Sequence, residues 1–520
     1  MKVSLPILTA ALVLSLPSVH RADTLQLLEP GNWSDPLIWS GPTTPVDDPA
    51  EHSLVTEADL PGGQLLLNEG PGTYRFISAT FGHASSLVLR NSTDFSKNNV
   101  TLAVEQDFVM NGSGNVGFSW NTNGTIYVTI GGDLIINDGS VRIGTSSAYA
   151  QRLTVSGSTV INKGLLSMRN GSRGSTASPV RLGRTTVGAE GHLELYTGGN
   201  NSTIEEFFQV QAFNGAGTVS VRNTTGTLYS GTLILDTADE ANLFSGVITE
   251  ELNAQLRLVK RNTGAVVLSG ENSYSGGTDV EEGHLTAAHQ RALGTGEATV
   301  SGGGRLTIAS GVNLGNAVTL DGGTLEAVGN LAGSGAALGF GANGGRIEGN
   351  GRLDVAVAFD DRNQVIAAAD GLARQTYGGD QSWQALTYEW GLNTWEETLP
   401  GPDAFSSLVT VEGELDLTGG DAFVLALRSF SGEEAGALAG FAEEDRSWTI
   451  LTAGDGIAGF DAALWTLDPT AFVNSFQGSW TLGLSGNDLV LSYHAIPEPG
   501  TWALLALGWS GILLLRRRRN

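Results

Sequence analysis

The sequence predicts an all-β protein: a single-stranded, right-handed parallel β-helix with a mixed, mainly β C-terminal cap and a C-terminal apolar helix. Three observations favour this fold. A glycine followed by alternating apolar residues recurs at spacings of 19 to 27 residues, an asparagine precedes several of these glycines, and glycine makes up 72 of 520 residues without the three-residue period of collagen. Such a repeat has the length of one coil, and each coil buries its inward side chains against its neighbours.

The first 22 residues predict a secretory signal peptide. Lys2 precedes an apolar run over residues 3–16, and Pro17 and Ser18 follow it. A charged segment, a hydrophobic segment and a helix breaker in this order are typical of such signals. We expect cleavage between Ser18 and Ala22 and export of the remaining chain.

Residues 23–100 are expected to form an N-terminal cap and the first coils. Trp33 and Trp39 lie here, in the segment GNWSDPLIWSG. Aromatic rings pack in protein cores, and their faces also stack on sugar rings. We interpret the two tryptophans as a lid over the first coil, with a sugar-binding platform as the alternative.

Residues 101–355 are predicted to form the coils. A long-period series of the unit Gly-x-φ-x-φ, in which φ is apolar, begins at Gly114, Gly139, Gly164, Gly191 and Gly217, with successive spacings of 25, 25, 27 and 26. This alternation is typical of a strand with one buried side. The asparagines that precede these glycines are Asn111, Asn137, Asn162 and Asn214. A turn residue at a fixed place in each period indicates a stacked ladder.

The same unit is expected to continue along the chain with a shorter period. It begins at Gly264, Gly283, Gly304 and Gly323, with spacings of 19, 21 and 19. A weaker pair follows at Gly345 and Gly351. With this pair the two series predict about eleven coils, which give a rod on the order of 50 Å long at a strand spacing of about 4.8 Å.

One segment, residues 258–308, carries a longer and more specific motif. Its residues are Gly264, Leu268, Gly270, Asn272, Tyr274, Gly276, Gly277, Thr278, Gly283 and Leu285. They resemble the autotransporter-associated β-strand repeat, which combines a Gly-x-φ-x-φ-x-Gly strand, an Asn-x-Tyr-x-Gly-Gly-Thr turn and a Gly-x-Leu strand. The resemblance implies a passenger-type β-helix and no chemistry.

Residues 356–495 are expected to form the C-terminal cap region. Strands are predicted at 408–417, 422–427, 448–451, 480–484 and 488–493. A short helix is predicted from Ser431 to Glu444, because Ser431 is a good N-cap and two glutamates, Glu433 and Glu434, follow it. We interpret the last strands as the terminator that a solenoid requires.

The final segment, residues 496–520, has the parts of a membrane sorting tail. Pro497, Glu498 and Pro499 form a turn motif, residues 501–515 are apolar, and the chain then continues with Arg516, Arg517, Arg518 and Arg519. As a helix the apolar run would span about 22 Å, less than the roughly 30 Å hydrocarbon core, unless the arginine stems reach the interface.

This order of parts resembles the sorting signal of PEP-CTERM proteins. The resemblance implies an exosortase-type processing enzyme as partner and transient insertion into the inner membrane through a short transmembrane helix. It also implies removal of the tail and delivery to the cell surface or extracellular matrix. A plain short membrane anchor is the alternative interpretation.

Composition excludes several classes of partner and chemistry. The formal net charge is −26 and there is no cysteine. Phosphate contacts require clustered Lys and Arg, so nucleic acid is not expected as a partner. Disulfides, thiolate metal sites and cysteine nucleophiles are excluded. The charge is compatible with divalent cations or a solvated exopolysaccharide, and no cofactor is predicted.

The best catalytic candidate is the run Asp360, Asp361 and Arg362. Polysaccharide hydrolases and lyases with a β-helix use aspartates, sometimes beside an arginine, for acid–base catalysis. An exposed turn that leaves the last coil is the favoured interpretation of these residues.

Two histidines are candidate metal ligands. His284 and His289 lie five residues apart beside Glu281 and Glu282. That spacing does not place two ligands on one helical face, and His284 is expected to point outward from a strand. No metal site is predicted.

An aromatic stretch precedes the predicted cap strands. Its members are Tyr377, Trp383, Tyr388, Trp390 and Trp395, with Asp380, Glu389, Glu396 and Glu397 between and beyond them. A glycan platform is one interpretation. Core packing is favoured, because Tyr388, Trp390 and Leu392 alternate as one buried side of a strand.

The leading hypothesis is a non-enzymatic structural or adhesive β-solenoid, secreted and either displayed on the cell surface or associated with the matrix. The alternatives are a secreted polysaccharide lyase or hydrolase, and a glycan-binding β-helix whose tryptophans point outward in a row.

Overall fold

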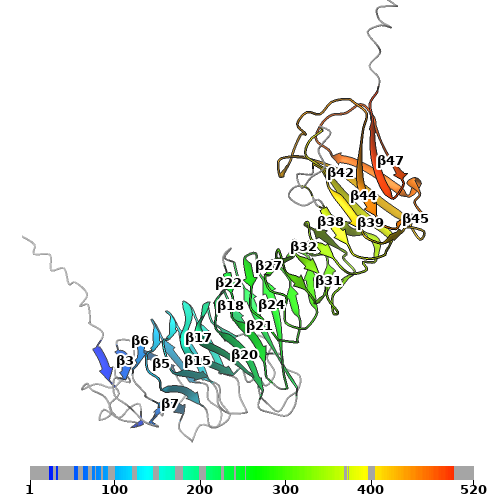
Figure 1. Cartoon of the computed structure of the whole chain (residues 1–520). Helices are drawn as coiled ribbons and strands as arrows, with labels where there is room; N and C mark the ends of the chain where they lie inside the picture. Colours follow the sequence, from blue (N-terminus) through cyan, green and yellow to red (C-terminus); the bar gives the residue numbers. More distant parts are fainter. Residues whose placement is uncertain are drawn as a thin grey trace, which may run out of the picture.

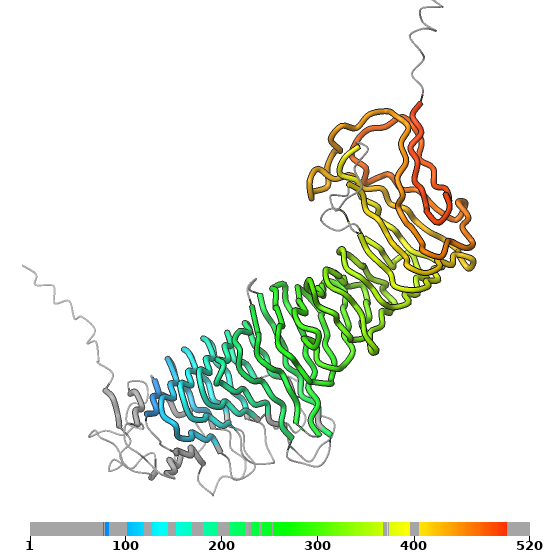
Figure 2. The backbone as a smooth tube through the Cα atoms, in the orientation of Figure 1, coloured from blue at the N-terminus to red at the C-terminus, as the bar shows by residue number. Residues whose placement is uncertain are grey.

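The computed structural model is an elongated stack of β-coils that leads from the N-terminal strands to a C-terminal cap (Figure 1). It describes strand segments between residues 23 and 91, and residues 100–496 except 120–125, 144–150, 170–179, 198–205, 224–227, 239–241, 252, 368–371, 373 and 396–404. Figure 2 follows the successive coils as a tube. Within these residues the only helical turn is the 3-10 turn at Ala462–Leu464. The all-β solenoid prediction is confirmed.

Three sheets run along the stack and are named face 1, face 2 and face 3. Face 1 has twelve strands, all parallel. Its strands are β5 (Thr73–Phe76), β8 (Val100–Val104), β11 (Ile126–Ile130), β14 (Gln151–Val155), β16 (Val180–Arg181), β18 (Glu206–Val210), β21 (Tyr229–Asp236), β24 (Ala254–Arg261), β26 (Thr278–Val280), β28 (Ala298–Ser301), β31 (Ala317–Asp321) and β34 (Ala337–Phe340).

Face 2 runs through the coils into the cap as one series of parallel pairs. Its strands are β1 (Asp23–Gln26), β3 (His52–Thr56), β6 (Ser78–Phe81), β9 (Phe108–Met110), β12 (Leu134–Ile136), β15 (Ser158–Arg169), β17 (Arg184–Thr197), β19 (Ala212–Gly215), β22 (Asn242–Phe244), β25 (Ala265–Leu268), β27 (Gly283–Ala287), β29 (Gly304–Ile308), β32 (Thr324–Ala327), β35 (Gly345–Glu348), β37 (Phe359–Ile366), β39 (Gln381–Leu392), β42 (Ala422–Ser431) and β46 (Trp465–Ala471).

Face 3 has two parts. The first includes the second halves of β15 and β17, together with β2 (Gly31–Asn32), β4 (Gly63–Leu67), β7 (Ser86–Asn91), β10 (Asn115–Ser119), β13 (Ser140–Ile143), β20 (Thr218–Asn223) and β23 (Val247–Glu250). The next two coils have turns instead of strands on this face. They continue the stack through hydrogen bonds from Ser273 N to Ile248 O (3.0 Å) and from Thr295 N to Tyr274 O (2.8 Å).

The second part of face 3 is an eight-stranded sheet that ends in antiparallel pairs. Its strands are β30 (Asn313–Leu314), β33 (Asn330–Leu331), β36 (Arg352–Leu353), β38 (Arg374–Tyr377), β40 (Leu408–Val411), β44 (Arg446–Ala453), β48 (Asp488–His494) and β47 (Ser479–Ser485). Three short strands complete the fold: β41 (Glu414–Asp416), β43 (Glu434–Ala435) and β45 (Gly456–Ala458).

The core consists of columns of inward side chains, one from each coil. Register pairs the buried residues of the predicted long-period series directly with one another: Val116, Val141, Leu166, Leu193 and Val219. Each member stacks on the next at the strand spacing, so apolar area is buried between coils as well as within them. The alternation that predicted these strands is confirmed.

The two glycine series, however, do not form one continuous ladder. The long-period series forms face 3, whereas the short-period series, with Val266, Leu285, Leu306 and Leu325 in register, forms face 2. The prediction that one unit simply continues is therefore wrong. Some glycines of both series have the same conformation, since Gly139 before a face 3 strand and Gly283 at the start of a face 2 strand have φ of 77° and 72°.

The predicted asparagine ladder exists over three coils. Nδ2 of Asn137 donates to Oδ1 of Asn111, and Nδ2 of Asn162 donates to Oδ1 of Asn137, both at 2.7 Å. Asn214 has a different role, because its Oδ1 accepts from the backbone N of Leu243 at 2.9 Å.

The cap strands lie where the sequence predicted them, but the predicted helix from Ser431 to Glu444 is wrong. β42 ends at Ser431, and Phe430 and Ser431 pair antiparallel with Ala435 and Glu434. Gly432 has a φ of 71°, which starts a hairpin turn. The serine and glutamates therefore belong to a turn, although their spacing imitates a helix N-cap.

The antiparallel strands β44, β48 and β47 close the C-terminal end of the stack (Figure 1). A parallel solenoid exposes a strand edge at its end, and such edges need a cover. The predicted apolar helix at 501–515 and the sorting motif lie outside the described residues. Among the residues that the structure describes, no helix is long and apolar enough to cross a membrane.

Candidate functional site: the repeat segment and a polar ladder on the outer surface

The repeat segment forms one coil whose turn is fixed by a buried asparagine. Asn272 is fully buried between β25 and β26. Its Oδ1 accepts from Ile248 N in the preceding coil (2.8 Å), and its Nδ2 donates to Ala292 O in the following coil (2.6 Å). One side chain thus satisfies a backbone donor and a backbone acceptor of two other coils.

The tyrosine of the same turn is a core residue. Tyr274 is fully buried, and its hydroxyl lies 2.7 Å from Oγ1 of Thr278. Burial raises the pKa of Tyr274, and the hydrogen bond to Thr278 lowers it by a smaller amount. The phenol therefore stays neutral and serves packing.

The glycines of the motif mark close backbone contacts. Gly277 has a φ of 86°, which a side chain rarely adopts. A Cβ on Gly276 would overlap the carbonyl oxygen of Leu256, and one on Gly270 would overlap that of Gly246. Leu268 and Leu285 fill the core behind them. The buried and close-packed motif residues thus have structural roles, and none of them forms a reactive constellation.

The segment also contains a buried lysine that the sequence analysis missed. Lys260, at the end of β24, has no exposed surface and stands in register with the core residue Val280. Its Nζ donates to the carbonyl oxygens of Arg261 (2.8 Å), Asn262 (2.5 Å) and Glu282 (3.2 Å). Burial lowers the pKa of Lys260 to about 8, against the opposing effect of nearby Glu282 and Asp236. A cationic group closes this corner of the coil.

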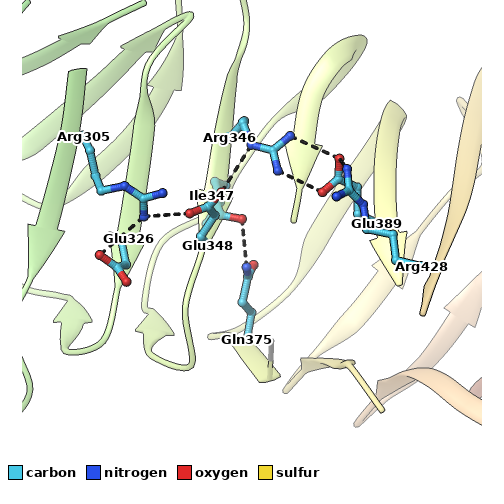
Figure 3. A network of polar contacts seen from close by, with 8 residues as sticks. All are labelled: Arg305, Glu326, Arg346, Ile347, Glu348, Gln375, Glu389 and Arg428. Carbon is cyan, nitrogen blue, oxygen red and sulfur yellow. Dashed lines mark hydrogen bonds and ion pairs between the residues drawn. The ribbon is translucent and has the colours of Figure 1, made fainter. Parts of the chain in front are cut away.

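A polar ladder runs along the outer side of face 2 (Figure 3). The ladder consists of Arg305, Glu326, Arg346, Glu348, Glu389 and Arg428. These residues come from five different strands, β29, β32, β35, β39 and β42. They point outward from neighbouring coils, so each acid meets a base of another coil.

The ladder alternates in charge from one end to the other. Nη1 of Arg305 lies 2.7 Å from Oε2 of Glu348, and Nε of Arg346 lies 3.3 Å from Oε1 of the same glutamate. Arg346 also binds Glu389 through two nitrogens, at 2.9 and 3.2 Å, and Arg428 lies 2.5 Å from the same carboxylate.

Because their carboxylates are buried, these ion pairs interact more strongly than ordinary surface ion pairs. The side chains of Glu348 and Glu389 are only 5% and 8% exposed. Burial alone would lower the pKa of Arg346, but hydrogen bonds and charge from Glu389 and Glu348 outweigh it and raise that pKa. Partly desolvated and bidentate pairs are screened less by solvent than exposed ones.

The ladder extends through a hydroxyl group and an imidazole. Thr307 donates its hydroxyl proton to Oε2 of Glu326 at 2.6 Å, so Nε2 of His284, 2.6 Å from the same hydroxyl, is the protonated nitrogen. Burial lowers the pKa of His284, while Glu326 raises it. Gln375 is not part of the ladder: this buried side chain of β38 on face 3 donates to the backbone oxygen of Ile347 at 2.9 Å (Figure 3).

This geometry suits a clamp between coils. Each carboxylate of the ladder is held by at least one guanidinium, and the bond from Arg346 to Glu389 joins a repeat coil to a long strand of the cap. A general acid or base must meet a substrate proton, whereas these carboxylates accept from the protein itself.

The catalytic candidates lie on an exposed bulge of β37. Asp360, Asp361 and Arg362 are all exposed. Oδ1 of Asp360 accepts from Nε2 of Gln364 (2.6 Å), and Oδ1 of Asp361 accepts from Asn363 N (2.9 Å). Pairing with β39 shifts register between Asp360 and Val365. The exposure agrees with the favoured interpretation, but the run does not leave the last coil, because β39, β42 and β46 continue the stack after β37.

The aromatic stretch is core, and its interpretation as a glycan platform is wrong for the described residues. Its five rings are at most 3% exposed: Tyr377, Trp383, Tyr388, Trp390 and Trp395. Tyr377 and Trp383 meet edge to face at 5.4 Å, and Trp395 packs against Phe441, Trp448 and Tyr493. Trp33, Trp39, Glu396 and Glu397 lie outside the described residues.

The residues weighed as metal ligands point to different partners. His284 contacts Thr307, Glu281 pairs with Arg261, and Nδ1 of His289 accepts from the backbone N of Arg291 at 3.2 Å. The structure therefore does not bring the two histidines and Glu281 together.

The repeat segment is similar to segments of known proteins. Residues 258–287 match the passenger-associated-transport-repeat family. The chain is also 40% identical over 111 residues to the adhesin BmaC autotransporter of Brucella suis biovar 1 (strain 1330). That alignment covers 19% of this chain and 3% of the relative, so the chain spans a small part of the relative's length. The predicted resemblance to an autotransporter-associated repeat is confirmed for this segment.

Proposed function

We propose that this protein is an exported adhesin-like β-solenoid that is displayed on the cell surface or held in the extracellular matrix. The observation that carries the proposal is the stacked coil at 258–287, which combines the passenger-associated repeat with buried, structural motif residues. The alignment with part of an autotransporter adhesin supports the same role.

The shape and charge of the chain suit display. A stack of parallel coils forms an extended surface from a short chain. Contacts between neighbouring coils stabilise the stack. The net charge of −26 keeps such a rod soluble and separates it from other anionic surfaces. The protein acts in this proposal as a non-enzymatic structural or adhesive element.

Sorting through the C-terminal tail is the finer part of the proposal. β48 ends at His494, and Ile496 is exposed at the end of the cap, where the tail begins. An exosortase-type enzyme would recognise the motif Pro497, Glu498 and Pro499 while the apolar run is transiently inserted in the inner membrane. The mature protein would then lack the four arginines.

Labelling of intact cells tests display. An antibody against the cap should label intact cells or their matrix, and deletion of the gene should reduce attachment to surfaces. A strain that carries the chain with Pro497, Glu498 and Pro499 changed to alanine is the matched control, because the cap is unchanged. Labelling that requires permeabilised cells, in both strains, would overturn the proposal.

C-terminal mass spectrometry tests processing. Protein released from the surface should end near Ile496, and the triple-alanine variant should keep its arginines and stay with the membrane fraction. Surface protein that retains the intact tail would instead support simple anchoring.

Enzymatic turnover is a separate test. The purified chain should not shorten bacterial exopolysaccharides. Turnover that is lost in Asp360→Ala, but kept in the neighbouring exposed variant Asn363→Ala, would replace this proposal by a polysaccharide-active enzyme.

A further inference from the structure

A polar groove crosses four successive coils on face 3, on a side of the rod different from the polar ladder. It has a volume of about 840 Å³ and lies over residues 290–295, 313–316, 330–335 and 352–354. We propose that this groove binds a segment of a linear, uncharged polysaccharide. The inference deepens the proposed adhesive function, on which it rests, by naming the class of ligand.

The groove exists because its floor lacks side chains. Gly294 has a φ of 64°, and a Cβ there would overlap the carbonyl oxygen of Tyr274, so packing requires this glycine. Gly315 is different: the nearest atom to an added Cβ is Ala332 O, 3.9 Å away, and its φ is not left-handed. The coil would tolerate a side chain at 315, and its absence leaves the groove open.

The rim offers one unused donor and one unused acceptor. Nδ2 of Asn330 donates to Oδ1 of Asn313 at 2.7 Å, which orients both amides. This leaves Nδ2 of Asn313 and Oδ1 of Asn330 without a partner among the described residues. A sugar hydroxyl both donates and accepts, so hydroxyls of a glycan can bond to either group. Oriented amides lose little freedom when a ligand binds.

The charges of the rim are already neutralised. Arg352 is held by Asp354 at 2.8 Å and by both oxygens of Glu412, and Arg291 lies 3.4 Å from Glu271. The whole chain is acidic, with a net charge of −26. An anionic polymer would meet paired arginines and a repulsive field, whereas a neutral glycan would meet fixed polar groups.

The direction of the groove favours a chain over a small molecule. Four coils at a spacing of about 4.8 Å give a length of about 14 Å along the rod. Asn313, Asn330 and Arg352 are in register, so a polar side chain recurs in three of the four coils. A chain of sugar residues that lies along the rod can therefore meet a polar side chain in each of these coils.

Affinity electrophoresis of the purified full chain in detergent tests the inference. The probes are dextran, a mixed-linkage β-glucan and a galactomannan as neutral polymers, and alginate as the anionic polymer. At least one neutral polymer should retard the protein, more strongly than alginate does. Gly315→Leu, which fills the groove, and the double variant Asn313→Ala/Asn330→Ala should each weaken retardation by about tenfold or more.

A matched control separates the groove from general effects. Gly483 in β47 of the cap has no heavy atom within 4 Å of an added Cβ, so Gly483→Leu adds the same side chain away from the groove. It should bind as the wild type does, and all variants should show the wild-type circular dichroism and melting temperature.

Three results would overturn the inference: no retardation by any neutral polymer, stronger retardation by alginate, or retardation that Gly315→Leu and the double variant leave unchanged. These outcomes are distinct from failure of the proposed function. A chain that binds no glycan but still labels intact cells and promotes attachment refutes only the groove. A chain that binds glycan but stays inside the cell refutes only display.

Discussion

Arg346 and Glu389 are 43 residues apart in the sequence and meet through two side-by-side hydrogen bonds, Nη2 to Oε2 at 2.9 Å and Nη1 to Oε1 at 3.2 Å. Arg346 belongs to β35 of a short repeat coil, and Glu389 belongs to the long strand β39. Arg428 of β42 binds the same carboxylate. The pair therefore links the regular coils to the cap across the intervening strand β37.

Removing the shared carboxylate should weaken this link. Glu389→Gln leaves two guanidinium groups facing a neutral amide in a largely buried place, so the free energy of unfolding should fall by about 2–3 kcal/mol. This figure lies below the range for fully buried pairs because the Arg346 side chain is 35% exposed. Urea denaturation followed by tryptophan fluorescence measures the change.

The matched control for the ladder is Arg362→Gln, which removes a charge from the exposed bulge of β37. It should change the stability by less than about 0.5 kcal/mol. If Glu389→Gln is no less stable than this control, the ladder does not clamp the cap.

A second prediction concerns the asparagine that bridges three coils. Asn272→Ala removes the partners of Ile248 N and Ala292 O, both in the interior, and should lower the free energy of unfolding by about 2–4 kcal/mol. Asn137→Ala, in the exposed asparagine ladder, leaves groups that water can reach, so it should lower the free energy of unfolding by less than about 1 kcal/mol. Comparable losses in the two variants would mean that burial does not distinguish the two asparagines.

A third prediction separates packing from sugar binding in the aromatic cap. Trp395 is 1% exposed, and its ring centroid lies 4.6 Å from that of Phe441 and 5.0 Å from that of Trp448. Trp395→Ala should destabilise the cap by about 3–5 kcal/mol and abolish much of the near-ultraviolet circular dichroism.

Trp395→Phe is the milder control. The indole N–H of Trp395 has no hydrogen-bond partner within the described part of the chain, so the phenyl ring leaves no acceptor unsatisfied. Trp395→Phe should therefore lower the free energy of unfolding by less than Trp395→Ala does. A stable Trp395→Ala protein that loses glycan retardation would restore the sugar-platform interpretation.

The sequence predicted the parts of the fold that repeat. Val116, Val141 and Leu166 alternate with outward residues and recur at 25-residue intervals, so strand and column both followed from pattern alone. The face on which a strand lies did not follow, because the same Gly-x-φ-x-φ unit precedes strands of both faces, and Gly139 on face 3 and Gly283 on face 2 even share a left-handed φ. The Ser431 turn was mistaken for a helix cap, since a local pattern does not report the left-handed φ of Gly432.

The polar features depended on register, which no local pattern contains. Arg305, Glu326 and Glu348 are 21 or 22 residues apart and each looks like an ordinary outward residue. Only the pairing of Thr307 with Glu326, and of Glu326 with Glu348, brings them into one row. The groove also escaped notice, because a glycine that leaves space looks in the sequence like a glycine that a turn requires.

The buried lysine supplies the last prediction, a dependence of stability on pH. Burial lowers the pKa of Lys260 to about 8, below the value of about 10.4 expected in the unfolded chain. Between these two values the unfolded state binds more protons than the folded state, so the free energy of unfolding should rise as the pH increases from about 8 to about 10.4. Below pH 8 both states are protonated and the contribution of Lys260 to the free energy of unfolding is constant.

Lys260→Met lacks this titration, and its stability relative to the wild type should fall by up to about 3 kcal/mol between pH 8 and pH 10.4. Lys163→Met, at a lysine whose side chain is 54% exposed, is the control and should follow the wild type. Thermal denaturation of the three proteins from pH 7 to pH 10.5 measures the differences. Parallel curves for the wild type and Lys260→Met would show that the three carbonyl oxygens around Nζ stabilise the ammonium enough to cancel the effect of burial.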